Sequence, residues 1–329
     1  MRHPAAIRTS LAALAGVSLL LTACGSGGGA APASSGTQTS DGVIDVVAST
    51  NVYGDIAAVI GGDKVNVTSM ITKTSQDPHS YEATAQDRLL VSKAELVIEN
   101  GGGYDTFLHK MADDSNIPHA NIVTAVDVAG LAEEAHAEPS PASSASADGH
   151  AHGEFNEHVW YSMDAMGKLA DSLAAKLGEL EPGSAALFTS NAATFKAGVD
   201  GLAGKLAVLK ANGTGAAVAV TEPVPLYLLE AAGLENRTPA DYTAAIEEGS
   251  DVPPAVLKAA TELAGSKDIR FLAYNEQTEG PQTEALKKAA ESAGVPVIDF
   301  SETLPEGKTY LQWMTDNVEN VSKVLEKNS

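Results

Sequence analysis

Short runs of β-branched and aliphatic residues alternate with helical patterns along most of the chain. In the first half these runs are residues 44–50, 65–71, 96–98 and 121–123, and residues 53–60 fit a helix between the first two. In the second half the runs are residues 217–221, 269–274 and 295–298. Strands that alternate with helices predict parallel sheets covered by helices on both faces. We therefore predict an α/β fold with two Rossmann-like lobes, one parallel sheet in each half.

Between the halves, residues 182–211 carry apolar side chains at helical spacing. Pro182 near the start and Gly213 after the end are typical of helix boundaries. A helix of roughly 29 residues would be about 43 Å long, enough to join both lobes as a rigid spine. Gly198, Gly201 and Gly204 leave open the alternative of two shorter helices with a break. We expect a first lobe at 42–181, this linking helix, and a second lobe at 212–329.

The N-terminal segment predicts export. Arg2 and Arg8 precede the apolar run 11–21, which is too short to span a bilayer and has the layout of a signal peptide. It ends in Leu-Thr-Ala followed by Cys24, the only cysteine. This resembles the lipobox of bacterial lipoproteins, which implies cleavage of residues 1–23 and a lipid on Cys24 at the extracytoplasmic face of the plasma membrane. An ordinary signal peptide with an incidental cysteine is the alternative.

Composition sets further limits. Residues 24–41 are mostly Gly, Ser, Ala, Thr and Pro, which predicts a flexible tether between membrane and domain. A lone cysteine forms no internal disulfide, so packing and ligand binding must hold the exported domain. The formal net charge of −22 argues against nucleic acid as a partner and suits a binder of cations.

Histidine is distributed unevenly. None of the 8 histidines lies beyond His158, and the two most distinctive histidine motifs are residues 77–82 and 156–160. A metal ion held between the two halves must therefore take carboxylate ligands from the second half. Imidazole plus carboxylate is a ligand set for a borderline divalent transition ion, and not for thiophilic copper or all-oxygen calcium.

These motifs carry a family resemblance. Residues 77–87, DPHSYEATAQD, resemble the first metal-ligand motif of the zinc- and manganese-binding solute-binding proteins of ABC transporters. Residues 156–162, NEHVWYS, are similar to the second motif, which usually has proline before the histidine; Glu157 takes that place here. The turn at 100–102 and the phrase YLQWM at 310–314 also match. The resemblance implies two α/β lobes joined by one long helix, with the metal in the cleft.

The resemblance also implies a ligand set of His79, His158, Glu222 and Glu302, with Asp299 as the runner-up for the fourth position. Glu222 stands where many members have histidine and some manganese-binding members have glutamate. Its alternative role is to stabilise the start of a helix near Pro223, where a carboxylate is favourable beside the amide ends.

The implied cargo is Zn²⁺ or Mn²⁺, passed to a membrane permease with a cytoplasmic ATPase by a monomeric receptor. The two carboxylates favour manganese, whereas the insert 133–154, with His136, His150 and His152, resembles the histidine-rich loop of zinc-binding members. The alternative interpretation of the insert is a solvated loop with no ligand role.

Two other functions are the alternatives, a metal-dependent hydrolase and a surface adhesin lipoprotein. Four protein ligands close a site that a hydrolase needs open, and the chain has neither a His-Glu-x-x-His nor a Gly-x-Ser-x-Gly motif. We therefore expect no enzyme activity.

Overall fold

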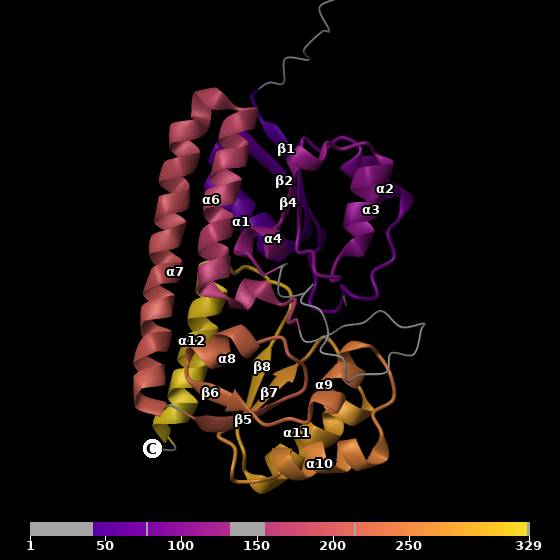
Figure 1. The fold of residues 1–329 in the computed structure, drawn as a ribbon, viewed down its shortest axis with the longest axis vertical. Coiled ribbons are helices and arrows are strands. Elements are labelled where there is room, and N and C mark those ends of the chain that lie inside the picture. Colours follow the sequence, from indigo (N-terminus) through magenta and orange to yellow (C-terminus); the bar gives the residue numbers. More distant parts are fainter. Residues whose placement is uncertain (1–41, 77, 132–154, 214, 328–329) are drawn as a thin grey trace, which may run out of the picture. The chain divides into compact units, whose positions relative to one another are not determined.

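Two four-stranded parallel sheets organise the chain (Figure 1). The computed structural model describes residues 42–76, 78–131, 155–213 and 215–327. The first sheet has the order β2-β1-β3-β4 and the second the order β6-β5-β7-β8. The strands are β1 Ile44–Thr50, β2 Val65–Ile71, β3 Leu96–Glu99, β4 Ile122–Thr124, β5 Ala216–Val220, β6 Leu234–Asn236, β7 Leu272–Asn275 and β8 Val297–Phe300. The predicted fold class, with one parallel sheet in each half, is confirmed.

The strand predictions differ in accuracy. β1 and β2 have the predicted bounds, whereas β7 begins three residues later than predicted, at Leu272. β6 was missed, because it is a three-residue edge strand, Leu-Glu-Asn, that pairs only with β5 and has no apolar run. Buried strands of parallel sheets are apolar on both faces and are therefore easier to detect than edge strands.

Helices cover both faces of each sheet. In β1, Val46 and Ala48 belong to a core with helices α1 (Asn51–Gly61) and α6 (Met163–Leu180), while Val47 belongs to a separate core with α2 (Ala85–Val91) and α3 (Thr106–Asp114). This alternation follows from the two-residue period of a strand. The second sheet shows the same alternation in β5. Val218 belongs to the core that contains Val46 and Ala48, whereas Ala219 packs against α9 to α11 on the other face. The other helices beside the two sheets are α4 (Ala125–Ala129), α8 (Leu226–Ala231), α9 (Ala240–Glu247), α10 (Pro254–Ala264), α11 (Pro281–Ala293) and α12 (Tyr310–Lys327).

Helix α7 (Ala185–Gly213) is continuous over 29 residues and follows a short 3₁₀ turn, Pro182–Ser184. It contacts α1 and α6 beside the first sheet and α8 and α12 beside the second, and Figure 1 shows it passing both sheets. The alternative of two shorter helices is wrong. A helical glycine costs about 1 kcal/mol relative to alanine, whereas a fully buried large apolar side chain contributes about 1.5–3 kcal/mol. α7 buries Phe188, Phe195 and Leu206 among others, so packing outweighs its glycines.

The chain order places the ends of the strands where a ligand site is expected. In each sheet the first strand pairs with strands on both of its sides, so the connections diverge from it. Ligands of open α/β sheets collect outside the carboxyl ends of strands at such points. The predicted signal peptide, tether and histidine-containing insert lie outside the described residues. Within the described part, no helix is both long enough and apolar enough to cross a membrane.

Candidate metal centre

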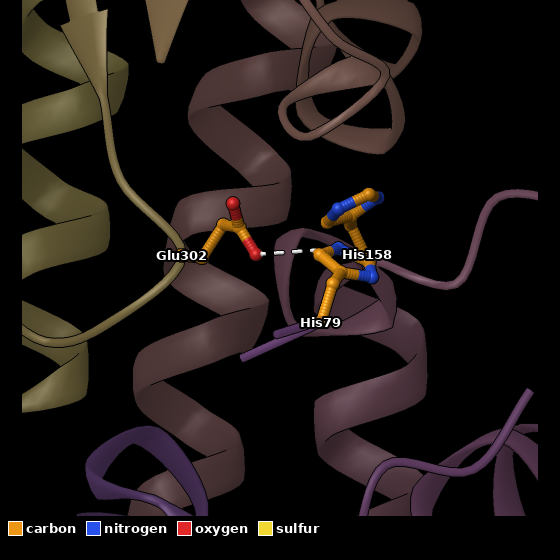
Figure 2. Close-up of side chains that lie close together, drawn as sticks. All are labelled: His79, His158 and Glu302. Atoms are coloured by element: carbon orange, nitrogen blue, oxygen red, sulfur yellow. Dashed lines mark ion pairs between the residues drawn. The ribbon is translucent and has the colours of Figure 1, made fainter. Parts of the chain in front are cut away.

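Three side chains that the sequence nominated lie together. Ligand atoms of His79, His158 and Glu302 are all within 4.8 Å of one another, and no other described group of His, Cys, Asp and Glu meets this criterion. Nε2 of His79 is 3.7 Å from Oε2 of Glu302. Figure 2 shows the three side chains pointing toward one another. Two imidazoles and one carboxylate suit a borderline divalent ion such as Zn²⁺ or Mn²⁺.

The three residues come from both halves of the chain. His79 lies in the loop after β2, and His158 immediately precedes the 3₁₀ turn Val159–Tyr161. Glu302 comes two residues after the end of β8, in the second lobe. His79 and Glu302 therefore both follow the carboxyl ends of strands, as expected for this topology.

His158 is held ready to act as a neutral ligand. Its side chain is buried, and its Nδ1 lies 2.7 Å from Oδ1 of Asn156. The same Asn156 oxygen accepts the backbone N–H of His158 at 3.1 Å. Burial, and then the neighbouring His79 ring, hold the pKa of His158 well below its usual range. Metal ions bind neutral imidazole, so His158 would need no deprotonation at neutral pH before binding an ion.

Glu302 is fixed by hydrogen bonds from both lobes. The Tyr104 hydroxyl donates to its Oε2 at 3.1 Å, and the Asn275 amide donates to its Oε1 at 2.8 Å. The backbone N–H of Glu302 donates to Oε1 of Gln277 at 2.6 Å. Burying a carboxylate is costly unless it is hydrogen-bonded, and these contacts offset that cost while leaving Oε2 facing His79.

Glu222, the third predicted ligand from the family motif, lies next to the cluster and not within it. It follows β5, is buried, and accepts hydrogen bonds from the Asn275 amide at 2.5 Å and from the Thr278 hydroxyl. Asn275 thus links Glu222 to Glu302 through one amide nitrogen. Helix α8 begins at Leu226 with Pro225 as its N-cap, and a role of Glu222 in stabilising that helix start stays the alternative. A ligand role for Glu222 stays a prediction.

Asp299, the runner-up for the fourth position, lies within β8 and is exposed. The structure places Glu302, and not Asp299, beside the two histidines. A side chain in the strand itself points to a sheet face, whereas one just after the strand end can reach the cleft.

Glu157 is a buried acid that the sequence reasoning did not assign to the site. Its Oε1 lies 3.4 Å from Nδ1 of His79. Burial first, and then the charges of Glu247, Asp105 and Glu302, raise the pKa of Glu157 to about 9. The signal available in the sequence was its position next to His158, where the family motif usually has proline. Asn275 was missed as well, although it ends the strand beside β5 and so lies at the divergence point of the second sheet.

A glycine turn holds the segment that carries Glu157. Asp105 accepts the backbone N–H groups of Asn100 at 2.6 Å and Gly101 at 2.9 Å, and the Asn100 amide donates to the backbone oxygen of Glu157 at 2.9 Å. Gly102 has a φ of 68°, and a Cβ there would lie 2.8 Å from Cε1 of Phe155. Glycine is therefore required at this position, both for the left-handed backbone and for the close approach.

Aromatic side chains form one wall of the site. The ring of Tyr104 meets the rings of His79 and His158 edge to face, with centroids 5.0 and 6.0 Å apart, and Trp160 packs against His158 at 5.2 Å. The Tyr310 hydroxyl donates to the backbone oxygen of Trp160 at 2.7 Å, which joins α12 to the histidine loop. This wall lowers the local polarity and strengthens electrostatic interactions at the site.

An acidic cavity of ≈ 550 Å³ lies beside His79. Its lining includes His79, Glu247, Glu248, Asp251 and Glu279. A cleft lined by one sign of charge raises the local concentration of oppositely charged ions and speeds their arrival. The cavity is therefore an electrostatically favourable place for a cation beside His79.

Comparisons with known proteins show the family of this chain. The profile of the family described as ZnuA, zinc-uptake complex component A, periplasmic, matches residues 46–324. The manganese ABC transporter substrate-binding lipoprotein scaA of Streptococcus gordonii is 24% identical over 312 residues, which cover 89% of this chain and 92% of that protein.

Solved structures show the same fold. The substrate-binding protein FpvC of Pseudomonas aeruginosa, in complex with Mn²⁺, superposes with a TM-score of 0.68 at 20% identity, covering 87% of this chain and 100% of FpvC. The periplasmic zinc-binding protein TroA of Treponema pallidum also gives 0.68, at 19% identity, covering 86% of this chain and 99% of TroA.

Proposed function

Because this chain belongs to the zinc-uptake complex component A family, we propose that it captures Zn²⁺ or Mn²⁺ outside the cytoplasm and delivers the ion to an ABC permease for import. The observation that carries the proposal is the cluster of His79, His158 and Glu302. Its donors come from both lobes, so one ion contacts both of them.

Both metals fit the donor set. Related proteins are described as binding manganese or zinc, as scaA and TroA illustrate. Two imidazoles suit zinc, and each added carboxylate makes the site harder and improves its match to manganese. We propose Glu222 as the fourth donor, because the Asn275 amide donates hydrogen bonds to both Glu222 and Glu302.

We propose transport and not catalysis as the role of the metal. Relatives of this chain are described as substrate-binding lipoproteins of transporters, which does not favour the hydrolase or adhesin alternatives. A site closed by four protein ligands has no open position for a catalytic water. The partners that follow are a membrane permease and its cytoplasmic ATPase, met by a monomeric receptor.

The sequence supports a lipid anchor on Cys24. The lipobox-like segment and the lipoprotein description of the relatives point to an extracytoplasmic, membrane-attached receptor. Residues 24–41 then provide the tether between the lipid and the folded part.

Titration calorimetry of the metal-stripped protein with Zn²⁺ and with Mn²⁺ tests the proposal. We expect one high-affinity ion per chain, and severe loss of affinity in both His79→Ala and His158→Ala. His119→Ala is the matched control, because His119 is exposed and lies outside the cluster. Parental affinity for both ions in both histidine variants would show that the site is wrongly assigned, and ester or peptide turnover by the loaded protein would favour a hydrolase.

A further inference from the structure

We propose that Glu157 is a positioning residue for His79: in the metal-bound protein its carboxyl group accepts a hydrogen bond from Nδ1 and thereby directs Nε2 toward Glu302 and the ion. The inference deepens the proposed function and rests on it. It concerns a residue of this chain that stands where the family motif usually has proline, a side chain with no acceptor.

The two nitrogens of His79 face two different carboxyl groups. Nδ1 lies 3.4 Å from Oε1 of Glu157, and Nε2 lies 3.7 Å from Oε2 of Glu302. Since Glu302 belongs to the three-residue cluster and Glu157 does not, the Nε2 edge of the ring faces the ion site. The Nδ1 edge faces Glu157.

Oε1 of Glu157 is placed for this contact and is otherwise unused. It is buried and makes no hydrogen bond to the described residues. Leaving a buried acceptor unsatisfied costs about 1–3 kcal/mol, so a donor at this position is favourable. The backbone oxygen of Glu157 is held by the Asn100 amide at 2.9 Å, which fixes where the side chain begins.

The neighbouring residue does the same for the other imidazole. Oδ1 of Asn156 lies 2.7 Å from Nδ1 of His158, so consecutive residues contact the Nδ1 atoms of the two histidines. Metal-bound histidines typically donate their second N–H to a carboxylate, a carbonyl or water, and loss of that partner costs about 10–100-fold in affinity. A carboxyl group keeps an acceptor oxygen in either protonation state, so the contact does not depend on ionisation.

Nitrogen-15 NMR of the zinc-loaded parent protein, labelled on histidine, tests the ring orientation without any substitution. We expect His79 to coordinate Zn²⁺ through Nε2 and to carry its proton on Nδ1, protected from solvent exchange. Coordination of Zn²⁺ through Nδ1 of His79 would overturn the proposal.

Calorimetry of variants tests the energetic consequence. We expect Glu157→Ala to bind Zn²⁺ about 10–100-fold more weakly than the parent and to lose the protected Nδ1 proton. Glu157→Gln keeps an acceptor oxygen and is expected to retain most of the affinity. Glu99→Gln is the matched control, because it removes a buried acid of β3 that lies outside the cluster, and its affinity should stay within about threefold of the parent.

The outcomes separate this inference from the proposed function. A parent protein that binds neither ion contradicts the proposed function. A parent that binds Zn²⁺ while Glu157→Ala binds equally well, with an unchanged Nδ1 proton, contradicts only the inference. Equal losses in Glu157→Ala and Glu99→Gln would show that the removal of a buried acid, and not ring positioning, is responsible. Melting curves of the metal-free variants, compared with the parent, test whether unfolding causes any loss of affinity.

Discussion

Nε2 of His79 lies 3.7 Å from Oε2 of Glu302, and the two residues follow strands of different sheets. Neither lobe holds the site alone, so an ion bound here is expected to stabilise the arrangement of one lobe against the other. Ligand binding to the native state raises apparent stability by about 2.7 kcal/mol when the free ion is at 100 times its dissociation constant.

The choice between the two candidate acids of the last strand is open to a direct test. We expect Glu302→Gln to lower zinc affinity by more than the roughly 10–100-fold typical of orienting residues, because it removes a charged donor from the cluster. Asp299→Asn, which makes the same change of charge three residues earlier at an exposed position, should leave affinity unchanged. Calorimetry with Zn²⁺ measures both, and the reverse pattern would transfer the ligand role to Asp299.

Substitution of Glu222 tests selectivity. Replacing a carboxylate by imidazole favours zinc over manganese, so Glu222→His should raise the zinc-to-manganese affinity ratio by tenfold or more, equivalent to ~1.4 kcal/mol. Competitive titration of both ions against parent and variant provides the measurement. If Glu222 serves only to hold Asn275 and Thr278, the variant will melt at a lower temperature and keep the parental ratio.

The buried acids predict an unusual pH dependence for the metal-free protein. The pKa is raised to about 6 in Asp105, to about 7 in Glu247 and to about 9 in Glu157, mainly by burial. Each folded-state pKa exceeds its unfolded value near 4, so the folded state binds these protons more tightly. The contribution of these groups to the free energy of unfolding is therefore greatest at low pH. It is lost as pH rises through each folded-state pKa.

Above about pH 7.5, Glu157 is the last of the three to lose its proton. The melting temperature of the metal-free parent should fall by at least about 3 °C between about pH 7.5 and about pH 9, equivalent to ~1 kcal/mol. Glu157→Gln should be nearly flat over this interval, and the exposed Glu248→Gln should follow the parent. Equal slopes in all three proteins would indicate general charge repulsion in this acidic chain.

Cys24→Ala tests the lipid anchor. The chain has no other cysteine, so the substitution should abolish incorporation of fatty acid and release the protein from the membrane. Metabolic labelling with a radioactive fatty acid, followed by membrane fractionation, measures both effects. Labelling of the variant at the parental level would contradict lipidation at Cys24.

Local patterns in the sequence were sufficient for most strands and for the long helix α7. β1 is a β-branched run with nearly every residue buried, β2 is a β-branched run of the same length at the sheet edge, and α7 has apolar side chains at helical spacing along its length. Such patterns follow from the repeat of the strand or helix itself and need no knowledge of distant residues. β6 shows where this fails, because an edge strand of three residues has no repeat to detect.

The sequence by itself, with the family resemblance that it carries, also nominated the candidate ligands His79, His158 and Glu302. Only the tertiary structure decided that Glu302 and not Asp299 meets the histidines, that Asn275 joins Glu222 to Glu302, and that Glu157 faces Nδ1 of His79. These contacts join residues from separate loops. Their geometry depends on how helices of both lobes pack against α7, which no local pattern encodes.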